Sequence, residues 1–247
     1  MNKKEINTIQ YIMKYYPNYL LLTICSLLFS LSASAHALWI ESQPHATKGV
    51  AHEVKIFYGE YATHEIESVD KWYSDVKAFK IILTTPGQKR IELNKEAHTD
   101  FFKSTFTPEE DGVYTLSIVH PAMDLGGTTK YEFSSAVLVK VGQPKVQTQD
   151  LPFYIHTEPK VFEEGQVVDA FVLQNGKPLP NTDLLVMSQE GWSKTLRTDA
   201  QGKVSFPAIW KGRYVLEASL NKDESGQWHN KPYKRSWQGT TASFLVQ

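Results

Sequence analysis

His36 stands directly after Ala33-Ser34-Ala35, a small-x-small sequence of the kind that signal peptidase cleaves. Cleavage there would start the exported chain at His36, with a free α-amine beside an imidazole. An α-amine titrates near pH 7.7–8.0 and an imidazole at about 6.5, so both can be neutral nitrogen donors close to neutral pH. The junction therefore predicts export and also suggests two of the nitrogen ligands of a metal site.

The segment before His36 has the composition of a cleaved secretory signal. Residues 19–31 form an apolar run of signal-peptide length, and three lysines among the first 14 residues supply the positive charge that precedes it. This run is too short for a comfortable membrane span. We therefore expect residues 1–35 to be a signal peptide, and the mature protein to be periplasmic with no membrane insertion after cleavage.

The composition of the mature chain limits the chemistry of any site. Cys25, the one cysteine, lies inside the expected signal, so a metal would be held by nitrogen and oxygen ligands. Attachment of a lipid to Cys25 is disfavoured, because the bulky Ile24 stands where a lipoprotein signal has a small residue. Without residues 1–35 the chain has 23 basic and 26 acidic residues, which argues against a nucleic-acid partner.

The first half of the mature chain reads as a β-sandwich. Short runs rich in Val, Ile, Phe and Tyr recur at intervals of about ten residues, with turn residues between them, as in all-β proteins. Tyr114 stands where immunoglobulin-like folds often place a tyrosine that bonds to a nearby corner of the main chain. Seven strands are predicted, near residues 37–42, 53–59, 77–84, 89–94, 101–106, 113–120 and 132–141.

A second set of strand and turn patterns follows a polar connection. Residues 143–152 carry two prolines and no periodicity, so we interpret them as a linker. The alternating runs resume at 166–173 and 183–188. The sequence therefore predicts two immunoglobulin-like or transthyretin-like β-sandwich domains in tandem, over residues 36–142 and 153–247.

Four histidines and one carboxylate are expected at one pole of the first sandwich. In an up-and-down arrangement, the start of the first strand and the ends of the second, fourth and sixth strands lie at that pole. Imidazole, amine and carboxylate ligands suit Ni(II), Co(II), Cu(II) and Zn(II), and the sequence does not rank these ions. Solvent-facing loop side chains are the alternative interpretation, and Glu60 and Glu65 could instead orient an imidazole. The predicted ligands are His36, Glu60, His64, His98 and His120.

Several short segments resemble a family of exported bacterial proteins. The resemblance lies in His36-Ala37-Leu38-Trp39-Ile40-Glu41, in Phe57-Tyr58-Gly59-Glu60-Tyr61 with Glu65, and in Gly176-Lys177-Pro178-Leu179-Pro180 with Thr198-Asp199-Ala200-Gln201-Gly202. The family, long known as a domain of unknown function, is described as the periplasmic component of cobalt or nickel ABC-type (ECF-like) uptake. The resemblance implies Ni(II) or Co(II) as cargo and an inner-membrane metal transporter as partner. The later segments also resemble carboxypeptidase-regulatory-like sandwiches.

Two other functions compete with metal uptake. A pair of sandwiches for adhesion or assembly would leave the histidines incidental. A copper oxygenase would coordinate copper with the amine and imidazole of the N-terminal histidine and with the imidazole of a second histidine on the β-sandwich. The sequence has no Gly-x-Ser-x-Gly elbow, no phosphate-binding glycine loop and no His-Glu-x-x-His pattern. We therefore expect a binding protein rather than an enzyme.

Overall fold

The computed structural model describes residues 36–144 and 149–247. The predicted signal peptide, residues 1–35, and the centre of the predicted linker lie outside the described residues. Within the described part, no helix has the length and apolar character needed to cross a membrane. The described residues from 36 onward belong to one compact unit.

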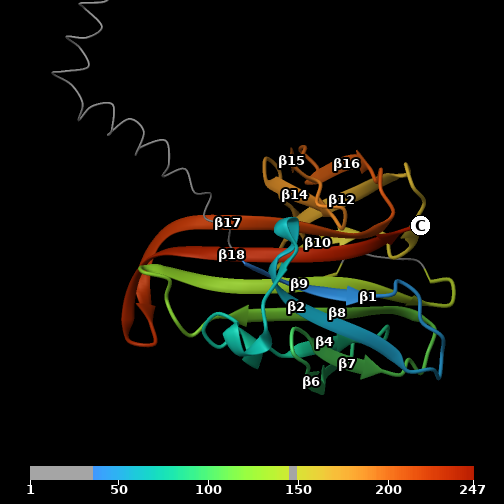
Figure 1. Ribbon diagram of the computed structural model, residues 1–247, viewed down its shortest axis with the longest axis horizontal. Coiled ribbons are helices and arrows are strands. Elements are labelled where there is room, and N and C mark those ends of the chain that lie inside the picture. The colour runs from blue at the N-terminus through green and yellow to red at the C-terminus, as the bar shows by residue number, and fades with distance from the viewer. Residues whose placement is uncertain (1–35, 145–148) are drawn as a thin grey trace, which may run out of the picture. The chain divides into compact units, whose positions relative to one another are not determined.

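Among the described residues, nearly all regular secondary structure is β-strand, which confirms the predicted all-β sandwich class (Figure 1). The strands of the first half are β1 (Ala37–Ser42), β2 (His52–Glu60), β3 (Glu65–Ile66), β4 (Ile81–Thr84), β5 (Arg90–Leu93), β6 (Lys95–Ala97), β7 (Phe102–Phe106), β8 (Gly112–Pro121) and β9 (Thr129–Val141). Short 3-10 turns connect some of them: η1 (Tyr61–Thr63), η2 (Val69–Lys71) and η3 (Val76–Ala78).

The second half begins at β10 and ends in two long strands. Its strands are β10 (Phe153–Thr157), β11 (Val161–Phe162), β12 (Val167–Gln174), β13 (Lys177–Pro178), β14 (Asp183–Ser188), β15 (Ser193–Arg197), β16 (Lys203–Pro207), β17 (Gly212–Trp228) and β18 (Lys231–Val246). The predicted strands at 166–173 and 183–188 coincide with β12 and β14. The expected strand at 77–84 is shorter, because η3 occupies its start.

One large sheet contains strands from both halves of the chain. Its order is β15-β14-β17-β18-β9-β8-β4-β5, and β9 pairs in parallel with β18, from Thr129 opposite Arg235 to Ser135 opposite Thr241. Figure 1 shows β17, β18 and β9 running side by side. A smaller sheet has the order β1-β2-β7-β6, with β3 paired to β2. The domain boundaries at 142 and 153 stay a prediction.

Alternation of side chains explains how β2 builds the core of the first half. Val54, Ile56 and Tyr58 are buried, whereas Lys55 and Phe57 between them are only partly buried and Glu53 before them is exposed, as the period of two in a strand requires. Fully burying one Val or Ile side chain stabilises the folded state by about 1.5–3 kcal/mol. This core also receives Trp237 from β18, so a residue of the second half helps to fill it.

Each half has a tyrosine that closes a corner of the main chain. The hydroxyl of Tyr114 donates to the main-chain oxygen of Glu110 at 3.0 Å and accepts from the N–H of the same residue at 3.1 Å. In the second half, Tyr214 accepts from the N–H of Trp210 at 3.1 Å. The corner predicted at Tyr114 is confirmed, and Gly212-Arg213-Tyr214 repeats the Gly-x-Tyr pattern of Gly112-Val113-Tyr114.

Candidate metal centre

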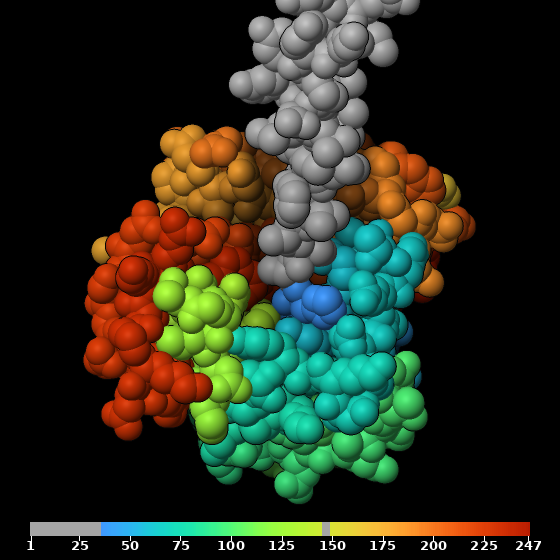
Figure 2. Space-filling view, turned by 60° about the vertical axis from the view of Figure 1, so that its left-hand side comes forward, coloured from blue at the N-terminus to red at the C-terminus, as the bar shows by residue number. Residues whose placement is uncertain are grey.

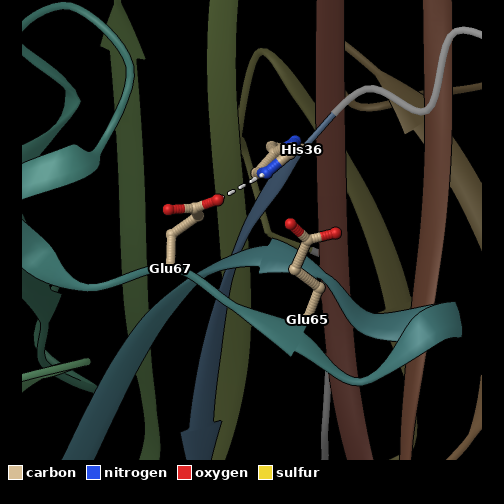
Figure 3. A group of neighbouring side chains, drawn as sticks. All are labelled: His36, Glu65 and Glu67. Carbon is tan, nitrogen blue, oxygen red and sulfur yellow. Dashed lines mark hydrogen bonds and ion pairs between the residues drawn. The ribbon is translucent and has the colours of Figure 1, made fainter.

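His36, Glu65 and Glu67 form a group of possible metal ligands at one end of the smaller sheet. Each offers one ligand atom, and these atoms all lie within 4.8 Å of one another. His36 immediately precedes β1, Glu65 begins β3, and Glu67 follows it. In Figure 3 both carboxylates lie below the imidazole, and a dashed line joins that of Glu67 to His36.

Strand pairing brings these three residues together. β1 pairs with β2 so that Ala37 lies opposite Gly59, and β3 pairs with the same end of β2 so that Ile66 also lies opposite Gly59. The turn between β2 and β3 closes at His64, whose φ of 59° is left-handed. The end of β2 therefore holds residue 36 and residues 65–67 close to one another.

Gly59 permits the close approach of β3 to β2. A Cβ atom at this position would overlap the main-chain oxygen of Glu65 and lie 3.1 Å from the Cα of Ile66. Glycine is the residue that avoids this overlap, because it has no Cβ. Gly59 therefore shapes the main chain that carries the two carboxylates.

The geometry of the group suits an accessible ion. The Nε2 atom of His36 lies 3.3 Å from Oε1 of Glu67, and the side chains are 31% and 23% exposed. Figure 2 shows the blue start of the described chain at the surface beside the cyan residues that follow β2. One imidazole nitrogen and two carboxylate oxygens form a donor set for borderline divalent metals, and the two negative charges would offset those of the ion.

Aromatic side chains pack next to His36 in this group. The ring of Tyr58 lies 5.5 Å from the ring of His36, and Trp72 lies 5.4 Å from Tyr58 on another side. Burial raises the pKa of the Tyr58 phenol, with smaller contributions from Tyr73 and Glu67, so this hydroxyl stays protonated. Tyr58 therefore acts as a neutral wall of the centre rather than as an anionic ligand.

Glu60, one of the predicted ligands, occupies a more buried position next to the group. It is 8% exposed and lies directly opposite Glu65 in the β2–β3 pair. Burial, and secondly the charge of Glu60, raise the pKa of Glu217 in β17 to about 8. The candidate centre thus adjoins a second, inner pair of carboxyl groups.

The remaining predicted ligands have other neighbours. His64 is exposed at the end of the turn after β2, and the imidazole of His98 stacks on Phe101 at 4.5 Å. In His120, Nε2 lies 3.2 Å from Oδ1 of Asp75. Among the described residues, the ligand group contains none of these three histidines. A metal-binding role for them stays a prediction.

The predicted ligand set contained His36 but neither Glu65 nor Glu67. Glu65 was considered only as a possible ligand or as a partner that orients an imidazole, and Glu67 was not singled out. A signal existed in the Glu65-x-Glu67 spacing, because alternate residues of an extended segment face the same side. That spacing points to a metal site only once residues 65–67 are known to lie beside His36.

Comparisons with known proteins assign a family and no activity. A family model described as a domain of unknown function, DUF4198, matches residues 33–222. None of the curated proteins is similar enough to match the chain.

Two solved structures show only weak likeness. A DUF4785 family protein from Legionella pneumophila is 14% identical with a TM-score of 0.32, and the match covers 76% of this chain and 52% of that protein. Salmonella alpha-2-macroglobulin is 9% identical with a TM-score of 0.29, over 85% of this chain and 15% of the macroglobulin. The chain thus spans about half the length of the first and a small part of the second.

Proposed function

The chain belongs to the DUF4198 family, a domain of unknown function, and we propose that it binds Ni(II) or Co(II) in the periplasm and passes the ion to an inner-membrane transporter. The observation that carries this proposal is the group formed by His36, Glu65 and Glu67, whose ligand atoms lie within 4.8 Å of one another. The resemblance of the His36–Glu41 segment to periplasmic uptake components supports the choice of cargo.

The proposed ligands are the imidazole of His36 and the carboxylates of Glu65 and Glu67. Signal cleavage before His36 would add its α-amine as a further nitrogen donor. Metal binding requires these groups to be deprotonated, so affinity should rise with pH as the nitrogen donors lose their protons. Partial exposure of His36 and Glu67 supports delivery, since an ion held at the surface can leave for a partner.

Calorimetric titration of the protein that begins at His36, with NiCl2 and CoCl2, tests the binding site. We expect His36→Gln and Glu67→Gln each to weaken affinity at least tenfold. His45→Gln is the matched control, because it makes the same chemical change at an exposed histidine that lies outside the ligand group. A wild-type protein that binds neither ion would overturn the proposal, as would unchanged affinity in both site variants.

The roles of the amine and of delivery need separate measurements. Adding one alanine before His36 moves the free amine away from the imidazole and should weaken binding, whereas equal affinity would remove the amine from the ligand set.

In cells, replacing the protein by its His36→Gln variant should lower accumulation of radioactive nickel at limiting external nickel. Unchanged accumulation of nickel would mean that the metal site has no role in nickel uptake.

A further inference from the structure

The main chain of Glu67 is held on both sides by hydrogen bonds. Its N–H donates to the main-chain oxygen of Tyr58 at 2.9 Å. Its C=O accepts from the indole Nε1 of Trp72 at 3.1 Å. Glu67 lies just beyond the end of β3, so the indole supplies a partner that the β2–β3 strand pair does not.

Trp72 is itself fixed by dense aromatic packing. It is 3% exposed, and its ring packs edge-on against Phe102 at 5.3 Å and stacks on Phe79 at 6.1 Å. Its contact with Tyr58 connects it to the aromatic wall beside His36. The indole N–H therefore projects from a side chain with little freedom to move, and it sets the main-chain position of Glu67.

We propose that Trp72 is a positioning residue of the metal centre, whose indole N–H holds Glu67 so that its carboxylate faces His36. This inference rests on the proposed function. Removing a group that orients a metal ligand without contacting the metal usually weakens metal affinity by about 10–100-fold. Trp72 acts through Glu67 and makes no contact with the ion itself.

The variant Trp72→Phe removes the N–H and keeps an aromatic ring in the core. We expect about tenfold weaker Co(II) affinity, and a visible spectrum of the Co(II)-saturated protein that shifts toward that of Glu67→Gln. Trp228→Phe is the matched control, since its indole donates to the main-chain oxygen of Ala122 at 2.8 Å, in another part of the molecule. This control should keep the wild-type affinity and spectrum.

A double variant separates positioning from general stability. If Trp72 acts through the Glu67 carboxylate, Trp72→Phe should cause no further loss of affinity in the Glu67→Gln background, whereas independent effects would add. Additive losses, or a wild-type spectrum and affinity in Trp72→Phe, would overturn the inference. A wild-type protein that binds neither Ni(II) nor Co(II) would instead refute the proposed function.

An isosteric analogue guards against failure of the phenylalanine variant to fold. Benzothienylalanine at position 72 keeps the fused double ring and lacks the N–H donor. We expect the same loss of Co(II) affinity and the same spectral shift. Wild-type behaviour of this analogue would overturn the role of the hydrogen bond.

Discussion

Thr241 in β18 donates its hydroxyl to the main-chain oxygen of Leu38 in β1 across 2.7 Å. Ser243 donates to the oxygen of Ile40 at 2.6 Å, and Oγ of Ser135 in β9 accepts from the N–H of Ile40 at 3.1 Å. One edge of β1 thus pairs with the main chain of β2, while side-chain hydroxyls satisfy the other. The second half of the chain thereby helps to anchor the strand that follows the candidate metal centre.

Thr241→Val should destabilise the fold, because it removes the hydroxyl and leaves the buried oxygen of Leu38 without this donor. We expect the free energy of unfolding to fall by about 1–3 kcal/mol, measured by urea denaturation. Thr195→Val in the exposed edge strand β15 makes the same chemical change and should stay within about 0.5 kcal/mol of wild type. Equal losses in the two variants would contradict the anchoring role.

The ion pair between Glu41 and Arg213 joins β1 to β17 in a largely buried setting. Their Oε2 and Nε atoms lie 3.0 Å apart, and the side chains are 24% and 12% exposed. Arg213→Met would remove the cationic partner of Glu41 and leave its carboxylate, among the described residues, to the indole N–H of Trp39, so we expect a loss of about 3 kcal/mol in the free energy of unfolding.

An exposed ion pair provides the control for this prediction. Arg197 and Asp183 approach to 2.8 Å, but each side chain is 62% exposed. Arg197→Met should therefore cost less than about 1 kcal/mol. Similar losses for Arg213→Met and Arg197→Met in urea denaturation would show that burial does not strengthen the Glu41–Arg213 contact.

Glu217 should make stability depend on pH. Its pKa of about 8 in the folded protein lies above the ordinary value of 4.5, mainly because of burial. Between these values the folded state holds a proton that the unfolded state releases, so the free energy of unfolding should fall as pH rises through that range. Glu217→Gln should remove most of this fall.

Urea denaturation at pH values from about 5 to 8.5 measures the contribution of Glu217. The variant Glu217→Gln should become more stable relative to wild type toward the alkaline end. Glu190→Gln, a change at an exposed glutamate, should follow the wild-type pH profile. Parallel profiles for wild type and Glu217→Gln would contradict the assignment.

Local patterns in the sequence predicted most of the strands but not how the sheets join. The alternation of Val54, Ile56 and Tyr58 identified β2, because side-chain burial at every second residue is a local property. The parallel pair formed by β9 and β18 is different. It joins Ser135 to Thr241, and nothing in either segment alone specifies that partner.

Only the part of the candidate site that depends on local sequence could be predicted. His36 could be singled out from the cleavage signal beside it, whereas Glu67 became relevant only through the reversal of the chain after β2. The arrangement of strand ends assumed for His64 and His98 did not include the short strands β3 and β6. Such short strands have little periodicity, so their presence depends on packing rather than on local sequence.

Gly59→Ala should disturb the metal centre without touching a ligand. The new Cβ would overlap the main-chain oxygen of Glu65, so β3 must move away from β2 and carry both carboxylates with it. Gly49→Ala is the control, because Gly49 also has a positive φ, of 76°, but has open space where the Cβ would lie. Both variants bear backbone strain, typically more than about 1 kcal/mol, and only Gly59→Ala should also weaken Ni(II) binding. Equal Ni(II) affinity of the two variants in calorimetric titration would mean that the position of β3 does not control the centre.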